Sequence, residues 1–559
     1  MKKRLFITLG LVLGLSCGIS ASASKTAYKR VTVRVIATND FHGRVHRLPW
    51  FAGHLNNLRK QARQAGEGVL LLDAGDMFQG TLESNLNEGA VVIDAYNALG
   101  YTAVTIGNHE YDFGPVGPAV TAKSPGDDPR GALKARAMQA KFPFLAANTV
   151  ETSTGKPPAW ENVHPSTLVQ VSGVKVGLIG VTTTETASST VAANVVGLRF
   201  PPLVKSIERE ATAMRAAGAA AVIVLAHEGG ECRSVSDSKD VSSCDLNEPI
   251  AKVARALHPG LVDLIVAGHT HQQMAHVING IPVIESKANG QAFGRVDLHI
   301  DERHKRVTAA KVFQPRNICK EARGEACTTE PYAGGDVKAD PRILAIIQPA
   351  ITRASKVKNR SLGVVVEQAL RRDYKQESSL GNFFADQMLR ARPKADVAII
   401  NAGALRVNLT KGLLTYGQLY EVHPFDNNFA RITLSGAQLR AILLRNLKSP
   451  AGILSIAGIT VNANCSQGML ELAMLRPNGQ RIRDEDVITV TTSDFLATGG
   501  DDLFRRKHLA RDAVAIEDTN IRDTLAKQLL KQGGTVRGDD FLRTRRWNHP
   551  GRRPMRCSP

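Results

Sequence analysis

The chain has 559 residues, more than one hydrophobic core accommodates, so two domains are expected. Its composition, 43% hydrophobic and 22% charged, is that of an ordinary globular protein and excludes a disordered or fibrous chain. The formal net charge of +19 favours anionic substrates or surfaces, although an arginine-rich genome would explain it equally well.

Residues 1–23 are predicted to form a secretory signal peptide. Lys2–Arg4 supply its charged start, Leu5–Leu15 its apolar run and Ala21–Ala23 a small-residue cleavage pattern. The apolar run is too short to span a bilayer, and no other segment is long and apolar enough to do so. We therefore expect a periplasmic or secreted protein without a transmembrane segment. The alternatives are an uncleaved anchor and a lipoprotein modified at Cys17.

Cysteine usage agrees with export, because six cysteines remain after cleavage. Two local disulfides, Cys232–Cys244 and Cys319–Cys327, are expected in an oxidising compartment. Cys465 and Cys557 either pair with each other or stay free, and they do not resemble a metal cluster.

Residues 30–335 alternate apolar strands with amphipathic helices, which predicts an α/β domain. The predicted strands are Val31–Thr38, Val69–Leu72, Ala103–Ile106, Ala221–Leu225 and Leu261–Val266. The predicted helices are Phe51–Ala65, Glu88–Leu99, Leu203–Ala216 and Glu248–Leu257.

Cys, Gly, Thr and Pro then interrupt this pattern, as expected at a domain boundary. Residues 336–360 are predicted to be a helical linker, with its helix at Pro341–Lys358. A second α/β domain is expected over residues 361–547. Residues 548–559 form a basic tail, which is usually a solvated end; nucleic-acid or membrane-surface contact through it is a weak alternative. The second domain's predicted helices are Leu380–Arg390 and Ala437–Leu447, and its strands include Asp396–Asn401, Phe429–Leu434 and Val487–Ser493.

Five short motifs follow the strands of the first domain. They are Asp40-Phe41-His42, Gly75-Asp76, Gly107-Asn108-His109-Glu110, Ala226-His227 and Gly268-His269-Thr270-His271. Each carries Asp, Asn or His, the ligands that divalent ions prefer. In α/β sheets, ligands collect past the carboxyl ends of strands. Each motif alone is weak, but their order and placement together predict a two-metal site.

Elementary electrostatics suggests roles within this set. Two dications about 4 Å apart repel by on the order of 16 kcal/mol at an effective dielectric of about 20, so an anion must lie between them. Asp76 is the best bridging candidate. A metal-held water whose pKa falls to about 7 supplies hydroxide for attack on phosphorus. His109, oriented by Asp112, would stabilise the phosphoryl group or protonate the leaving alkoxide. The alternative is a capping pair at a helix start.

The five motifs resemble those of the calcineurin-like metallophosphoesterases, and Thr38–Gly43 and Gly107–Asp112 specifically resemble secreted bacterial 5′-nucleotidases. The resemblance implies an N-terminal four-layer α/β/β/α sandwich and a second α/β substrate-binding domain, joined by a helical linker. It implies a catalytic dyad of His109 and Asp112, and two divalent ions that the sequence leaves as zinc, manganese, cobalt or iron. The implied ligands are Asp40, His42, Asp76 and His271 for one ion, and Asp76, Asn108, His227 and His269 for the other.

Three stretches of the second domain resemble the nucleotidase substrate site: Asn401–Arg406, Pro424–Asn427 and Phe495–Asp501. From the residues alone, Arg406 suits bidentate phosphate contact, and either Phe would be ordinary core packing. The resemblance implies that Phe425 and Phe495 sandwich the base, Asn427 contacts its edge, Asp501 contacts the ribose, and Asn401 and Arg406 contact the phosphate. One departure is Gln376, which occupies a usual arginine slot. Either the phosphate is held more weakly, or Arg371, Arg372 or Lys375 substitutes for that arginine.

We therefore expect a two-metal phosphohydrolase that releases phosphate from nucleoside 5′-monophosphates by metal-activated hydroxide attack. The close alternatives are a 2′,3′-cyclic-nucleotide phosphodiesterase/3′-nucleotidase and a nucleoside-diphosphate-sugar hydrolase; a sulfur-ester hydrolase is less favoured. A different class is a non-catalytic nucleotide- or surface-binding protein. The preferred base and the oligomeric state stay open.

Overall fold

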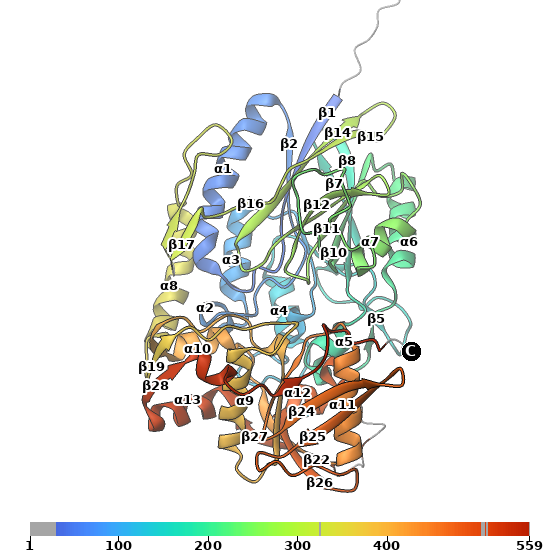
Figure 1. The fold of residues 1–559 in the computed structure, drawn as a ribbon. Helices are drawn as coiled ribbons and strands as arrows, with labels where there is room; N and C mark the ends of the chain where they lie inside the picture. The colour runs from blue at the N-terminus through green and yellow to red at the C-terminus, as the bar shows by residue number, and fades with distance from the viewer. Residues whose placement is uncertain (1–29, 324–325, 505–508, 510–512, 558–559) are drawn as a thin grey trace, which may run out of the picture.

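The computed structural model describes residues 30–323, 326–504, 509 and 513–557 (Figure 1). The predicted signal peptide, residues 1–23, lies outside the described residues. Within the described part of the chain, no helix combines the length and the apolar character needed to cross a membrane.

The N-terminal domain contains two β-sheets that pack face to face. One sheet runs in the order β15 (Arg306–Val312), β14 (Ala292–Asp301), β1 (Arg30–Thr38), β2 (Gly68–Asp73), β3 (Ala103–Thr105), β4 (Phe144–Leu145) and β6 (Val163–His164). The other runs in the order β12 (Gln273–Ile278), β13 (Ile281–Ser286), β11 (Leu264–Ala267), β10 (Ala221–His227), β8 (Val174–Thr182) and β7 (Ser166–Val171). Apolar side chains of both sheets, such as Val35 and Ile223, share one buried cluster.

Helices cover the outer face of each sheet, which completes the predicted α/β/β/α layers. Helices α1 (Leu48–Ala65) and α3 (Ala90–Leu99) pack on the first sheet, and α8 (Pro341–Lys358) packs on the outer side of these two helices. Helices α6 (Leu203–Ala216) and α7 (Pro249–Ala256) pack on the second sheet. The two groups flank the sandwich on opposite sides (Figure 1). The amphipathic pattern places each apolar stripe against its sheet, so the helix predictions agree with the structure.

The C-terminal domain is built around a five-stranded sheet. Its order is β23 (Leu454–Ala457), β20 (Val397–Asn401), β26 (Val487–Ser493), β22 (Asn428–Ser435) and β27 (Val514–Asn520). Helix α11 (Gly436–Lys448) packs on one face, and α9 (Ser379–Ala391) and α13 (Ile521–Gln532) pack on the other. This arrangement confirms a second α/β domain.

Helix α8 joins the domains and belongs to both cores. Ile343 and Ile347 are buried in the N-terminal core, whereas Ala354 is buried in the C-terminal one. Leu82, from the short helix α2 (Leu82–Asn85), is buried in the same C-terminal cluster. At the end of α8, Lys358 lies 2.9 Å from the Glu83 carboxylate. The two domains therefore meet along α2 and α8.

The basic C-terminal end is exposed at Arg552 and Arg556, as expected, but parts of residues 547–557 pack against the second domain. Trp547 is buried, and its indole N–H donates to the Leu454 carbonyl oxygen at 2.9 Å. Arg553 donates to the carbonyl oxygens of Asn446 and Ala451 at 3.2 and 3.1 Å. The many arginines of the segment predicted exposure to solvent, but backbone carbonyl oxygens accept the hydrogen bonds of Arg553.

The described residues contain three disulfides: Cys232–Cys244, Cys319–Cys327 and Cys465–Cys557. The two local pairs agree with the prediction, and the third joins the C-terminal segment to β24 (Thr460–Ser466).

We predict that thiol titration of the unfolded, unreduced protein lacking residues 1–23 finds no free thiol, because all six remaining cysteines are paired. The same sample after reduction is the control and should give six. Six free thiols before reduction would contradict the disulfide assignment.

Candidate functional site

The seven predicted metal ligands come together at one edge of the N-terminal sandwich. Strands β1, β2 and β3 are parallel neighbours, as are β10 and β11, so the motifs that follow them meet at the carboxyl ends of both sheets. Two groups form, Asp40 with His42 and His271, and Asp76 with His227 and His269; in each, one potential ligand atom per residue lies within 4.8 Å of the others.

Asp76 lies between the two groups. Its Oδ2 atom is 3.1 Å from His227 Nε2 and 3.9 Å from His42 Nε2. Asn108 joins the second group, with its Oδ1 atom 3.0 Å from His227 Nε2. The geometry therefore agrees with a bridging position for Asp76.

Five of these seven residues hold a left-handed backbone, namely Asp40, His42, Asp76, His269 and His271. This conformation costs non-glycine residues about 1–3 kcal/mol each and persists only where the surroundings impose it. Here the turns after β1 and β2 stay paired, since the Asp40 N–H donates to the Gly75 carbonyl at 2.9 Å and the His42 N–H to the Asp76 carbonyl at 3.0 Å. The strained turns bring the predicted ligands of neighbouring loops to the same point.

Two motif glycines are required by this crowding. A Cβ atom on Gly107 would clash with the Asp76 carboxylate, and one on Gly75 would lie 2.9 Å from His227 Nδ1. The two glycines therefore allow the loops that carry Asp76, Asn108 and His227 to lie close together.

The chemistry of the donors fits divalent cations. His42 Nδ1 and His227 Nδ1 each lie 2.8 Å from a backbone carbonyl oxygen, so both carry a proton and the Nε2 atoms point into the site. His227 Nε2 faces two acceptors, Asp76 and Asn108. Burial alone would lower the pKa of His227, but the Asp76 carboxylate raises it to about 10. The negative charge that stabilises a proton on His227 would also stabilise a metal cation at the same place.

Other imidazoles of the site are held neutral, which is the form that ligates metals. Burial lowers the pKa of His269 to about 3 and lowers that of His42 well below its usual range. Neutral imidazoles beside buried carboxylates match the mixed nitrogen and oxygen set of transition-metal sites.

His109 and Asp112 form the predicted pair. His109 Nδ1 lies 2.6 Å from Asp112 Oδ2, and the Thr190 hydroxyl donates to Asp112 Oδ1 at 2.7 Å. The His109 backbone N–H donates to Asp76 Oδ1 at 2.9 Å, so the pair is fixed to the metal-ligand groups. The short helix at His109–Tyr111 has no side-chain cap, which argues against the capping alternative.

The C-terminal domain contributes Arg406 and Phe425 directly to this site. Arg406 Nη2 lies 3.1 Å from His42 Nε2 and 3.4 Å from His271 Nε2. The Phe425 ring centroid lies 5.6 Å from that of His109 and 5.9 Å from the Arg406 guanidinium carbon.

The remaining predicted substrate residues lie in the C-terminal domain, and none of them is among the residues that line the pocket beside His271. Asn401 donates to Asp501 Oδ2 at 2.7 Å, so it is beside the predicted ribose contact. Asn427 donates to Asp494 at 3.0 Å. Phe495 packs over Gly500, where an added Cβ would lie 2.5 Å from its ring.

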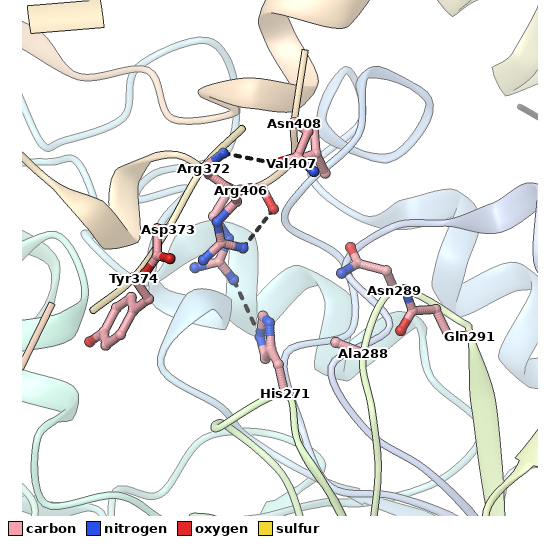
Figure 2. Close-up of a pocket in the computed structure, with 10 residues that line it drawn as sticks. All are labelled: His271, Ala288, Asn289, Gln291, Arg372, Asp373, Tyr374, Arg406, Val407 and Asn408. Atoms are coloured by element: carbon pink, nitrogen blue, oxygen red, sulfur yellow. Dashed lines mark hydrogen bonds between the residues drawn. The ribbon is translucent and has the colours of Figure 1, made fainter. Parts of the chain in front are cut away.

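A pocket of about 590 Å³ opens beside His271 (Figure 2). Arg372 and Arg406 both line it, and Arg372 Nη1 donates to the Arg406 carbonyl at 3.0 Å. Gln376 is exposed and does not line the pocket, and Lys375 pairs with Glu231 at 3.3 Å. Of the three substitutes that the sequence offered, only Arg372 lines this pocket.

Two buried carboxylates escaped the sequence analysis as functional residues. Glu110 accepts the backbone N–H groups of Asp76, Met77 and Gly107 at 2.7–2.8 Å, and burial together with the charge of Asp76 raises its pKa. Glu285 accepts bonds from the loop that carries His269 and His271. Their signals were an acid inside a metal motif and an acid on the apolar strand β13.

Comparisons with known proteins agree with this architecture. The calcineurin-like phosphoesterase model matches residues 33–273, and the 5′-nucleotidase C-terminal domain model matches residues 353–507. Endonuclease YhcR of Bacillus subtilis (strain 168) is 27% identical over 84% of this chain, but the chain spans only 37% of that relative's length. A 5′-nucleotidase of Vibrio cholerae serotype O1 is 24% identical over 85% of this chain and 86% of its own.

The fold also matches a solved structure. The crystal structure of a 5′-nucleotidase precursor from Thermus thermophilus aligns with a TM-score of 0.72 at 21% identity, over 93% of this chain and 99% of that one. With both domain models matched in order, the chain belongs to the family in which a calcineurin-like phosphoesterase domain is followed by a 5′-nucleotidase C-terminal domain.

Proposed function

We propose that this chain is a metal-dependent phosphohydrolase that releases phosphate from nucleoside 5′-monophosphates outside the cytoplasm. The observation that carries the proposal is the position of Arg406, whose guanidinium reaches His42 and His271 from the second domain. A guanidinium beside metal-ligand groups suits a phosphate that both must contact. The three disulfides support an oxidising compartment.

The residues that would hold two ions are Asp40, His42, Asp76 and His271 for one, and Asp76, Asn108, His227 and His269 for the other. Divalent ions bound there would polarise phosphoryl oxygens and lower the pKa of water. Zinc, manganese, cobalt and iron all suit this donor set.

His109 would act on the phosphoryl group from the side of the cleft. Its Nδ1 atom is engaged by Asp112, so Nε2 is left to donate a proton to a leaving or phosphoryl oxygen. Because Thr190 holds the other oxygen of Asp112, the imidazole is fixed in orientation. The ring of Phe425 lies beside it and limits the space for the substrate.

The nucleoside would bind to residues of the C-terminal domain. Phe425 and Phe495 would stack on the base, which is worth about 1–3 kcal/mol per base and tolerates any base. Asn427 would contact the base edge, and Asp501 would contact the ribose hydroxyls. The resemblance assigns Asn401 to the phosphate, but its amide donates to Asp501, so we propose that it supports the ribose contact instead. Arg406 and Arg372 would contact the phosphate.

The direct test is phosphate release from a panel of nucleotides, with and without a chelator. We expect release from nucleoside 5′-monophosphates, loss of activity after exhaustive chelation, and recovery when divalent metal is added. Preference for 2′,3′-cyclic nucleotides or nucleoside-diphosphate sugars would replace the proposed substrate. No turnover with any nucleotide and any metal would favour a binding protein instead.

We predict that Arg372→Ala raises KM for nucleoside monophosphates about tenfold or more, because a charge-assisted bond to the phosphate is lost. Arg371→Ala is the matched control, since Arg371 is its exposed neighbour outside the pocket and should leave KM unchanged. Equal KM values for the two variants would contradict the role of Arg372.

A pH dependence follows from Asp501. Although Asp501 is exposed to solvent, desolvation by the surrounding protein raises its pKa to about 6, against the opposing hydrogen bond from Asn401. Above this pKa the carboxylate accepts ribose hydroxyls; below it the group is protonated and accepts less well. We predict that KM rises as pH falls below about 6, and that Asp501→Asn removes this rise while raising KM at neutral pH. A KM profile that is identical in the variant would contradict the assignment.

A further inference from the structure

A buried carboxylate, Glu285, lies behind three of the histidines that meet in the site. We propose that Glu285 is a positioning residue that sets the metal-ligand geometry by clamping the His227 loop to the His269–His271 loop. The inference rests on the proposed metal site, but not on the identity of the substrate.

Glu285 is completely buried near the end of β13. Its Oε1 and Oε2 atoms accept the Thr270 hydroxyl at 2.8 and 2.9 Å, and Oε1 accepts the Gln272 backbone N–H at 3.0 Å. Oε2 also accepts the Gly230 backbone N–H at 3.4 Å. One carboxylate therefore holds backbone or side-chain groups from both loops.

The two loops are also in direct contact. The Thr270 hydroxyl lies 3.0 Å from the Gly230 carbonyl oxygen. A Cβ atom on Gly229 would clash with the Gly268 carbonyl and the Thr270 hydroxyl, and would lie 2.8 Å from Glu285 Oε2. No space is left for the loops to adjust separately, so the position of Glu285 is transmitted to both.

The clamped turn is one that needs support. Thr270 lies between His269 and His271, whose backbones have φ angles of 73° and 59°. Such conformations persist when hydrogen bonds and packing over-determine them. Among the described residues, Glu285 forms no salt bridge, so hydrogen bonds to these loops are its principal compensation for burial. The acid Glu285 therefore lies on an apolar strand at the point where it can hold the two loops that carry the histidines.

The test measures metal binding without nucleotide. For Glu285→Ala we expect the affinity for cobalt(II), measured by competition with a chelator, to fall about 10–100-fold, the usual effect of removing an outer-shell partner of a metal ligand. The visible absorption spectrum of bound cobalt should change as well. In turnover, kcat should fall while KM for a nucleoside monophosphate stays within about threefold, because Glu285 does not face the cleft.

Glu285→Gln is the rescue variant. Its carboxamide oxygen still accepts the Thr270 hydroxyl and the Gln272 N–H, and only the long bond from the Gly230 N–H is lost. Cobalt affinity and spectrum should therefore be much closer to those of the wild type than to those of Glu285→Ala. If Glu285→Ala does not fold, Thr270→Val removes the same hydroxyl and should weaken cobalt binding in the same way.

Asp263→Asn is the matched control. Asp263 is a largely buried carboxylate at the opposite end of the same sheet, where it pairs with Arg215 at 2.6 Å. Its loss should lower Tm without changing cobalt affinity. Wild-type cobalt affinity and spectrum in Glu285→Ala, or in Thr270→Val if that variant replaces it, would overturn the proposal. A Glu285→Gln variant as impaired as Glu285→Ala would overturn it too.

Discussion

The site depends on the burial of carboxylates and imidazoles at one edge of the two sheets, where the potential ligand atoms of each group lie within 4.8 Å of one another. Asp76 is the centre of this constraint. Its Oδ1 accepts the His109 N–H, its Oδ2 lies between His42 and His227, and its own N–H is held by Glu110. Left-handed turns, close-packed glycines and buried outer carboxylates are the means by which the chain keeps these groups together, and cations are what such a cluster fits.

The second domain completes the site through the same loops. The Gln79 carbonyl accepts from His42, while the Gln79 side chain donates to the Pro424 carbonyl at 3.1 Å, next to Phe425. A single residue therefore connects His42, a proposed metal ligand, with the loop that carries Phe425. Ion pairs of Arg44 with Glu421 and Lys358 with Glu83 support the same contact. Substrate binding would thus depend on how the domains meet.

Much of the fold was predictable because hydrophobic periodicity is a local signal. Helices α6 and α8 have the predicted bounds, and the strand predictions differ by a few residues. That these seven side chains meet at one edge of the sandwich was predictable, because their residue types follow strand ends. Glu285 and Arg372 were harder, since their roles depend on loops distant in sequence. The partial packing of the C-terminal segment was not predictable, because charge composition does not reveal backbone acceptors such as that of Asn446.

The central claim, that these seven side chains form a two-metal site, is tested most directly by counting bound metal. Titration of metal-free protein with manganese or zinc in a calorimeter, with elemental analysis of the product, should give two ions per chain. Asp76→Asn, which weakens the bridge between both groups, should lower the number or affinity of bound ions. Zero or one ion per wild-type chain at saturation, or unchanged binding in the variant, would contradict the account.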